Sequence, residues 1–186
     1  AWLLANVAFT YNSYLDDFNR AARYDEQAKT ILVDRLDQED LLVAEYLYLP
    51  LGNLKTKLGE EAAAEVYLKK GLAVSLDQGS LRLAADAYSD LSVLYLGYGR
   101  LPEAVRVLEE GLDLPGLPPF TQGLLQGNLA LVYTEMKDYE KALGHARSSR
   151  RSFVQDTLRR ASDSPRIKLA GVERMLGEIN GLMERY

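Results

Sequence analysis

The chain has 186 residues, of which 47% are hydrophobic and 26% charged, a balance typical of one folded domain with a substantial core. Its formal net charge of −5 argues against a general nucleic-acid binder, because such proteins carry a basic footprint. It contains no cysteine, which excludes disulfides and thiolate metal sites and agrees with a cytoplasmic location.

No apolar run reaches the roughly 18 residues that a membrane span needs, so we expect no membrane insertion. The first residues, AWLLANVAF, are apolar but have no basic region before them, which makes them a poor signal peptide. The chain also begins in mid-pattern without a methionine. We therefore expect it to be a fragment of a longer protein.

Helical periodicity predicts two helices within residues 2–36, with a turn at Asp16 and Asp17. A third helix is predicted from about Gln38 to Leu58. Pro50 falls inside it and removes an amide donor, so we expect a kink or break near Tyr46–Pro50. A bent groove wall would be one reason for this irregularity, but local accommodation in a long helix is the interpretation that we favour.

The later helices are separated by turn residues. Gly59 is predicted to end the third helix, Ser80 to cap the fifth, and Pro102 to lie in the first turn of the sixth. Ser164 and Pro165 are predicted to start the last helix. The loop at residues 115–119 is the strongest break. The predicted helices after the third run over residues 61–76, 81–97, 102–114, 121–136, 139–161 and 165–186.

Small and large residues recur at matched spacing along these helices. The segments AEVYLKKGL, residues 64–72, and AVRVLEEGL, residues 104–112, align without a gap. Small residues let two helix backbones approach closely, and large residues fill the holes beside them. The small set is Gly52, Ala64, Gly71, Ala104, Gly111, Ala130 and Ala142; the large set is Tyr48, Leu51, Leu68, Tyr88, Leu91, Tyr95, Leu108, Leu129 and Tyr133.

This pattern resembles the tetratricopeptide repeat (TPR), a helix, a tight turn and an antiparallel helix. The resemblance implies an all-α, right-handed superhelix of four hairpins, over about residues 2–36, 38–77, 80–114 and 120–160. A terminal helix at 165–186 completes a single domain. The repeats are longer than the usual length of about 34 residues. They resemble those of kinesin light chains, LuxR-type activator sensor regions and Rap-like phosphatase regulators.

The resemblance implies a protein- or peptide-binding scaffold that serves as a sensor or adaptor region of a bacterial regulatory protein. In such repeats the first helices line a groove, and Asn128 matches the groove asparagine of the family. Asp90 occupies the same position one repeat earlier, and Pro50 the same position one repeat before that. Neighbouring groove positions are Asn6, Asn53, Lys57, Asp86 and Leu124. This mixed, partly acidic surface suits a basic or amphipathic segment, or no peptide at all.

The terminal helix carries a seam of heptad type. Its members are Leu169, Val172, Leu176, Ile179 and Met183. The favoured interpretation is a helix that caps the open end of the stack. The alternative is a dimerisation helix, which would make the chain a homo-oligomerisation module. Gly177 and Gly181 lie four residues apart and would allow close approach of a neighbour.

Residues for catalysis are scarce. His145 is the single histidine, and a packed or solvated role suits it better than a catalytic one. The sequence has no glycine-rich phosphate loop and no nucleophile elbow. We therefore expect no catalytic site, no metal site and no cofactor. Residues 144–170 are rich in arginine, and we favour a solvated helix face for this stretch. The alternative is a surface for an acidic partner, nucleic acid or the acidic end of a second copy.

Overall fold

A computed structural model describes residues 44–159 and 164–184, together with a few helical residues nearer the N-terminus. Those few are Arg20, Arg23, Tyr24, Glu26, Gln27 and Thr30. Every regular element within these residues is a helix, which confirms the predicted all-α class. Apart from those few residues, the predicted first hairpin lies outside the described part of the chain, and so does Asn6.

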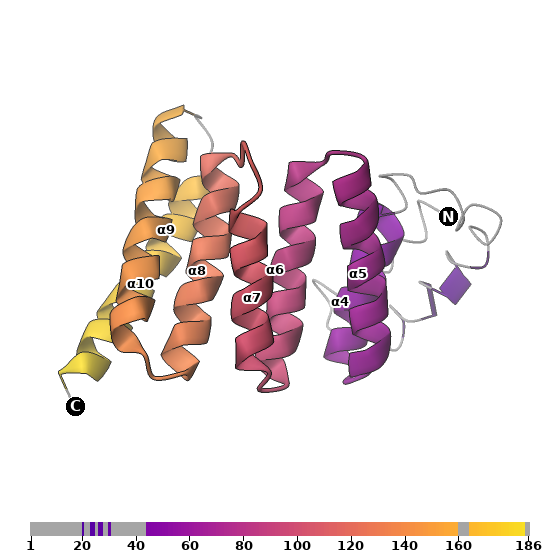
Figure 1. Cartoon of the computed structure of the whole chain (residues 1–186), viewed down its shortest axis with the longest axis horizontal. Coiled ribbons are helices and arrows are strands. Elements are labelled where there is room, and N and C mark those ends of the chain that lie inside the picture. The colour runs from indigo at the N-terminus through magenta and orange to yellow at the C-terminus, as the bar shows by residue number, and fades with distance from the viewer. Residues whose placement is uncertain are drawn as a thin grey trace. The chain divides into compact units, whose positions relative to one another are not determined.

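The helices follow one another with short connections (Figure 1). Their ends differ from the predicted ones by a few residues at most wherever both are described. None of the described helices is both long and apolar enough to cross a membrane. The elements are η2 Ala44–Tyr48, α4 Leu49–Lys57, α5 Glu61–Asp77, α6 Leu81–Gly97, α7 Leu101–Leu112, α8 Pro119–Glu135, α9 Tyr139–Arg159 and α10 Ser164–Met183.

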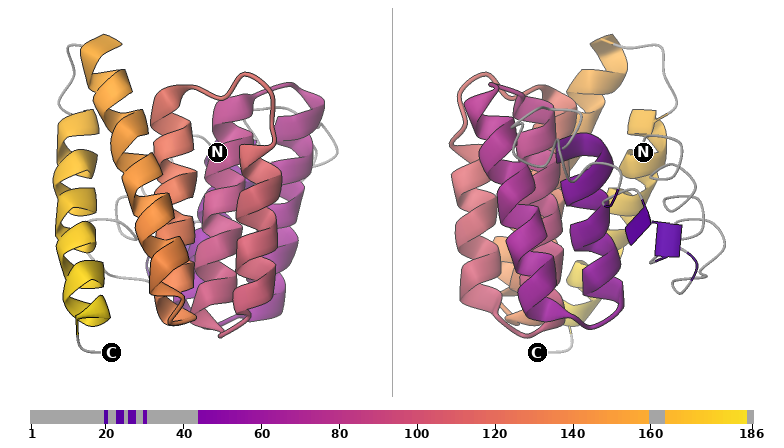
Figure 2. Two further views of the ribbon diagram at one scale, coloured as in Figure 1. Left: turned by 60° about the vertical axis from the view of Figure 1, so that its left-hand side comes forward. Right: turned by 90° about the vertical axis from the view of Figure 1, so that its right-hand side faces the viewer.

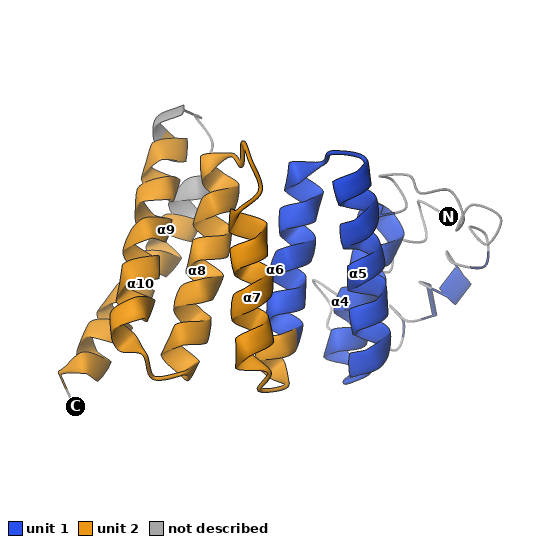
Figure 3. Cartoon of the chain, in the orientation of Figure 1, with its two compact units in different colours: residues 1–94 blue, residues 95–186 orange. Residues whose placement is uncertain are grey.

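The chain divides into two compact units, residues 1–94 and 95–186 (Figure 3). The boundary falls near the end of α6, so the last turn of that helix belongs to the second unit. The single domain that the sequence suggests stays a prediction.

The predicted irregularity at Tyr46–Pro50 is present as a π-helical turn. Residues Ala44–Tyr48 form the π-helix η2, and α4 begins directly after it with Pro50 in its first turn. A proline in this place has no amide to donate, and the wider π turn tolerates that loss. The proline is therefore accommodated by a change of helix type.

Four helix ends share one turn geometry. Gly59, Gly79 and Gly99 have φ of 76°, 67° and 71°, and the residue after each donates its amide back to the carbonyl five positions earlier. Left-handed φ of this kind favours glycine. Lys137 has φ of 62° in the fourth turn, where Asp138 donates to the Tyr133 carbonyl at 2.9 Å. Lysine thus occupies a conformation that glycine adopts more easily.

In unit 1, α4 and α5 pack through paired glycines. A methyl group added at Gly52 of α4 would lie 2.5 Å from Leu68 Cγ of α5. One added at Gly71 of α5 would lie 2.5 Å from Leu49 Cδ2 of α4. Each helix therefore inserts a leucine over a glycine of the other, which brings the two backbones close together.

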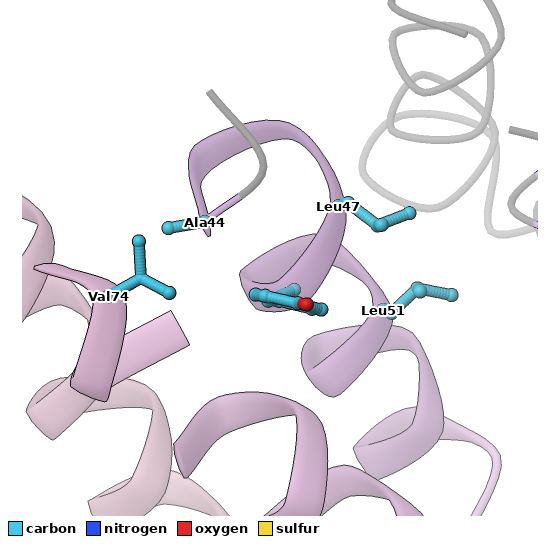
Figure 4. Packing of buried hydrophobic residues seen from close by; sticks show 5 residues of the cluster. Ala44, Leu47, Leu51 and Val74 are labelled. Atoms are coloured by element: carbon cyan, nitrogen blue, oxygen red, sulfur yellow. The ribbon is translucent and has the colours of Figure 1, made fainter. Parts of the chain in front are cut away.

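A second cluster joins η2 to α5. Val74 of α5 points toward Ala44, and Leu47 and Leu51 point to the same side one turn apart (Figure 4). Tyr48 belongs to the same cluster, and all five side chains are buried. The π-helical turn is thus anchored by apolar burial, which offsets its poorer hydrogen-bond geometry.

In unit 2, α8 and α9 repeat this kind of packing. A methyl group at Gly123 would lie 2.8 Å from Phe153 Cε1, and the Ser149 hydroxyl donates to the Gly123 carbonyl at 2.6 Å. The small residues Ala130 and Ala142 are fully buried. Ala64 in α5 and Ala104 in α7 are also fully buried, so the predicted role of the recurring alanines in packing is confirmed.

The last helix, α10, lies alongside α9 (Figure 2). Val172 and Ile179 of the predicted seam are buried, and Leu169 and Leu176 are half-buried. Met183, at the C-terminal end of the seam, is 38% exposed. Arg150 of α9 pairs with Glu173 of α10 beside the apolar contact.

Candidate partner-binding face

Two predicted groove residues meet in unit 1. Asn53 of α4 donates its Nδ2 hydrogen to Asp90 Oδ2 of α6 at 2.8 Å, and both side chains are half-buried. The contact spans 37 residues of sequence. It joins two helices that the repeat pattern predicts to be successive first helices.

A second contact crosses the same pair of segments. Arg82 of α6 donates through Nη2 to Glu45 Oε1 of η2 at 2.7 Å and through Nη1 to Asp86 Oδ2 at 3.2 Å. Arg82, Asp86 and Asp90 follow one another at four-residue spacing, so they share one face of α6. We call this surface the unit 1 polar face; it consists of Glu45, Asn53, Arg82, Asp86 and Asp90.

The two aspartates of this face are hard to ionise. Burial raises the pKa of Asp90 to about 7; the Asn53 hydrogen bond works against that rise and the nearby Asp86 adds to it. Burial also raises the pKa of Asp86, although Arg82 opposes that shift and Glu45 reinforces it. Near neutral pH the face therefore holds a carboxyl group that a cation would help to ionise.

The other predicted groove residues are distributed as follows. Lys57 is exposed at the end of α4, one turn after Asn53. Leu124 and Asn128 lie one turn apart on α8 in unit 2, and both are half-buried. A single groove that includes both sets stays a prediction, since the two sets belong to different units.

Sequence reasoning missed Glu45 and Arg82. Their separation of 37 residues equals that of Asn53 and Asp90, and Arg82 precedes Asp86 by one helical turn. The i,i+4 spacing of Arg82 and Asp86 could have revealed half of this cluster. Glu45 carried no such local signal, because its partner lies on another helix.

His145 is a packing residue between α8 and α9. Its ring stacks on Tyr133 with centroids 5.2 Å apart, and its Nδ1 lies 2.7 Å from Gln126 Oε1. Burial lowers the pKa of His145; Glu109 opposes that shift and Lys141 strengthens it. These contacts agree with the packed role expected for a lone histidine. Among the residues with described positions, no cluster of His, Asp and Glu could hold a metal ion.

The basic stretch is partly used inside unit 2. Arg150 pairs with Glu173, and Arg151 donates to the Ser148 hydroxyl at 2.9 Å. Arg147 and Lys168 are exposed. The side chains of residues 158–167 lie outside the described part, so the role of the whole stretch stays open.

Comparison with known proteins bears on the fold alone. No family model matches the sequence, and no curated protein does. Two crystal structures of the nearly identical TPR-like repeats of a Podosopora anserina protein assigned as a kinesin light chain are similar to this chain, and one of them is of a substituted variant. The variant structure shares 18% identity at a TM-score of 0.68, covering 98% of this chain and 90% of that one. The other structure shares 18% identity at a TM-score of 0.67, covering 97% of this chain and 90% of that one. The chain thus has a TPR-like repeat fold.

Proposed function

We propose that this chain is a protein- or peptide-binding scaffold and that the unit 1 polar face binds a basic or amphipathic segment of its partner. The single observation that carries the proposal is the contact between Asn53 and Asp90, with Asp86 one turn away. TPR-like repeats are in general protein-binding and typically non-catalytic. A role as the sensor or adaptor region of a regulatory protein fits this activity.

The chemistry of the face favours a cationic group. A lysine or arginine beside Asp90 would restore the charge that burial disfavours, and charge-assisted hydrogen bonds are about twice as strong as neutral ones. The Asn53 amide is an adaptable partner for an extended backbone, because it carries both donors and an acceptor. The partner we infer is therefore a segment with a basic side chain that reaches Asp90.

The same face is poorly suited to an acidic tail. Arg82 already lies between two carboxylates, Glu45 and Asp86, so its charge is satisfied within the protein. An incoming carboxylate would lie close to Asp86 and would further disfavour ionisation of Asp90. Like charges in a partly desolvated site repel strongly.

Fluorescence anisotropy with matched labelled peptides tests this proposal. We would compare amphipathic peptides that differ only in carrying lysine, glutamine or glutamate at their polar positions. The lysine series should bind most tightly, and Asn53→Ala combined with Asp86→Ala should weaken it about tenfold or more. Asp113→Asn, an exposed carboxylate of unit 2, is the control for a change in net charge. Equal binding of the three series would contradict the proposal.

The second candidate is a homo-oligomerisation module that acts through α10. We favour a capping role for the seam of that helix, because Val172 and Ile179 are buried where α10 meets α9. Light scattering separates the two candidates. A chain that stays monomeric at high concentration would count against self-assembly, whereas a dimer lost on removal of residues 165–186 would favour it.

A further inference from the structure

The side of α10 that faces away from α9 carries a hollow of about 610 Å³. Among the residues with described positions, its lining consists of Arg174, Gly177, Glu178, Gly181 and Leu182. Gly177 is exposed, and a methyl group added there would meet no atom within 4 Å. In Figure 2, α10 lies at the edge of unit 2 with α9 along one side of it. This face of α10 is therefore open, whereas the apolar seam on its other side, with Val172 and Ile179, is buried where α10 packs on α9.

The buried side of α10 matches that of α8. Leu125, Leu129 and Val132 are buried on α8. Val172, Leu176 and Ile179 follow at the same spacing on α10, where two are buried and Leu176 is half-buried. Each helix contacts the helix before it, α7 for α8 and α9 for α10. By this register α10 corresponds to a first helix of a repeat.

In the same register, the two helices differ on the side that faces a second helix in α8. On α8 the small residues Gly123 and Gly127 lie under Phe153 and Ser149 of α9, and Ala130 on the same helix is fully buried. The corresponding residues of α10, at identical spacing, are exposed. They are Ala170, Arg174 and Gly177.

Unit 1 supports this reading independently. Gly52 of α4 follows Leu51 as Gly177 follows Leu176, and Leu68 of the second helix α5 packs onto Gly52. In the α4–α5 and α8–α9 hairpins, a large side chain of the second helix thus packs onto a glycine of the first, Leu68 onto Gly52 and Phe153 onto Gly123, which corresponds to Ala170 of α10. Over Gly177 the described residues place no such side chain.

We propose that the open face of α10 binds an amphipathic α-helix of a partner protein, packed antiparallel to α10 as a second helix packs in a repeat. Its large apolar residues would lie over Gly177 and Gly181. An acidic residue near Arg174 and a basic one near Glu178 would complete the contact. This proposal uses residues of unit 2 only and does not depend on the unit 1 polar face.

A second copy of this chain fits the face less well. Its own α10 would bring Gly177 and Gly181, which supply no large side chain to fill the hollow. The face of α10 that does carry large apolar residues is buried against α9. The chemistry of the hollow therefore favours a separate helix with exposed leucine, methionine or phenylalanine residues.

A peptide made from this chain is a suitable probe, because α5 is a second helix whose Leu68 packs onto a glycine. We would use residues Glu61–Asp77 with a lactam between Glu65 and Lys69, which already form an i,i+4 ion pair at 2.6 Å. The link holds the isolated helix, which would otherwise be marginal in water. Amide NMR of the full chain should show shifts and slowed hydrogen exchange in residues 171–183.

Gly177→Leu places a large side chain where the partner helix would pack and should weaken binding of this peptide about tenfold or more. Gly144→Leu is the matched control, since Gly144 is also an exposed helical glycine with open space around it, on α9. The peptide variant Leu68→Glu should not bind. Amide shifts that are confined to residues outside α10, or a Gly177→Leu protein that binds the peptide with wild-type affinity, would overturn the proposal. If the wild-type chain forms a dimer and the Gly177→Leu variant is monomeric, the occupant of this face is a second copy of the chain, and the proposal of a separate partner helix is wrong.

Discussion

Leu68 of α5 lies over Gly52 of α4 so closely that residue 52 has no room for a methyl group. The side chain is fully buried, and its position is held from the other side because Gly71 of α5 receives Leu49 of α4 in the same way. The close approach of the two helices thus depends on glycine at both places.

Gly52→Ala should therefore destabilise the protein by roughly 1–3 kcal/mol, the usual cost of overpacking a core. Gly144→Ala is the control, because that helical glycine is exposed and alanine favours a helix by up to about 1 kcal/mol. Chemical denaturation measures both. A Gly52→Ala protein as stable as the Gly144→Ala protein would contradict the packing described here.

Lys137→Gly should stabilise the protein by about 1 kcal/mol, because Lys137 has a positive φ that costs a side chain more than it costs glycine. Lys137→Ala removes the same charge and keeps the strained backbone, so it should bring no gain. Thermal unfolding compares the two variants. Equal melting temperatures would show that the turn carries no strain.

The pKa of Asp90 makes stability depend on pH. Its folded-state pKa of about 7 lies above the ordinary 3.8, so the ionised group disfavours the folded state. Stability from this group is full below about pH 4, falls as the pH rises toward 7, and stays low above that. Asp90→Asn should raise the melting temperature at about pH 8 and leave it nearly unchanged at about pH 4. A gain of equal size at both values would contradict the assignment.

His145 should titrate below its ordinary pKa of 6.5, since burial against Tyr133 disfavours the charged ring. Stability from this group is then present above pH 6.5 and is lost as the pH falls through the folded-state value. The chain has one histidine, so its ring resonances can be assigned without ambiguity in an NMR titration. A midpoint above 6.5 would contradict the buried position.

Ile179→Ala tests the contact of α10 with α9. Ile179 is 1% exposed, and loss of such a side chain costs roughly 2–5 kcal/mol. Met183→Ala on the same helix should cost under about 0.5 kcal/mol, because Met183 is 38% exposed. Comparable losses for the two variants, measured by urea denaturation, would show that α10 does not cap α9 as described.

Much of the fold could be predicted because it depends on spacing. The recurring alanines marked the buried helix faces, and Gly59 marked the end of α4. The left-handed turn at Lys137 carried no glycine and gave no signal. The π-helical turn before Pro50 was anticipated only as an unspecified irregularity.

The site was harder to predict, for a geometrical reason. The repeat pattern equates Asp90 with Pro50, but Asp90 contacts Asn53, almost one turn further along α4. Asp90 thus meets a residue three positions away from its repeat equivalent, so equivalent positions in two repeats need not be neighbours. Sequence periodicity therefore identifies the face of each helix, and only the structure shows which residues meet across it.

The most direct test of binding at the unit 1 polar face is an NMR titration of the full chain with a labelled lysine-rich amphipathic peptide. We predict that the largest amide shifts fall on residues 45–57 and 82–90, and that Asp90→Asn reduces the affinity while Asp113→Asn does not. Shifts confined to other residues, or equal affinity for the Asp90→Asn protein and the wild type, would contradict the proposed partner site.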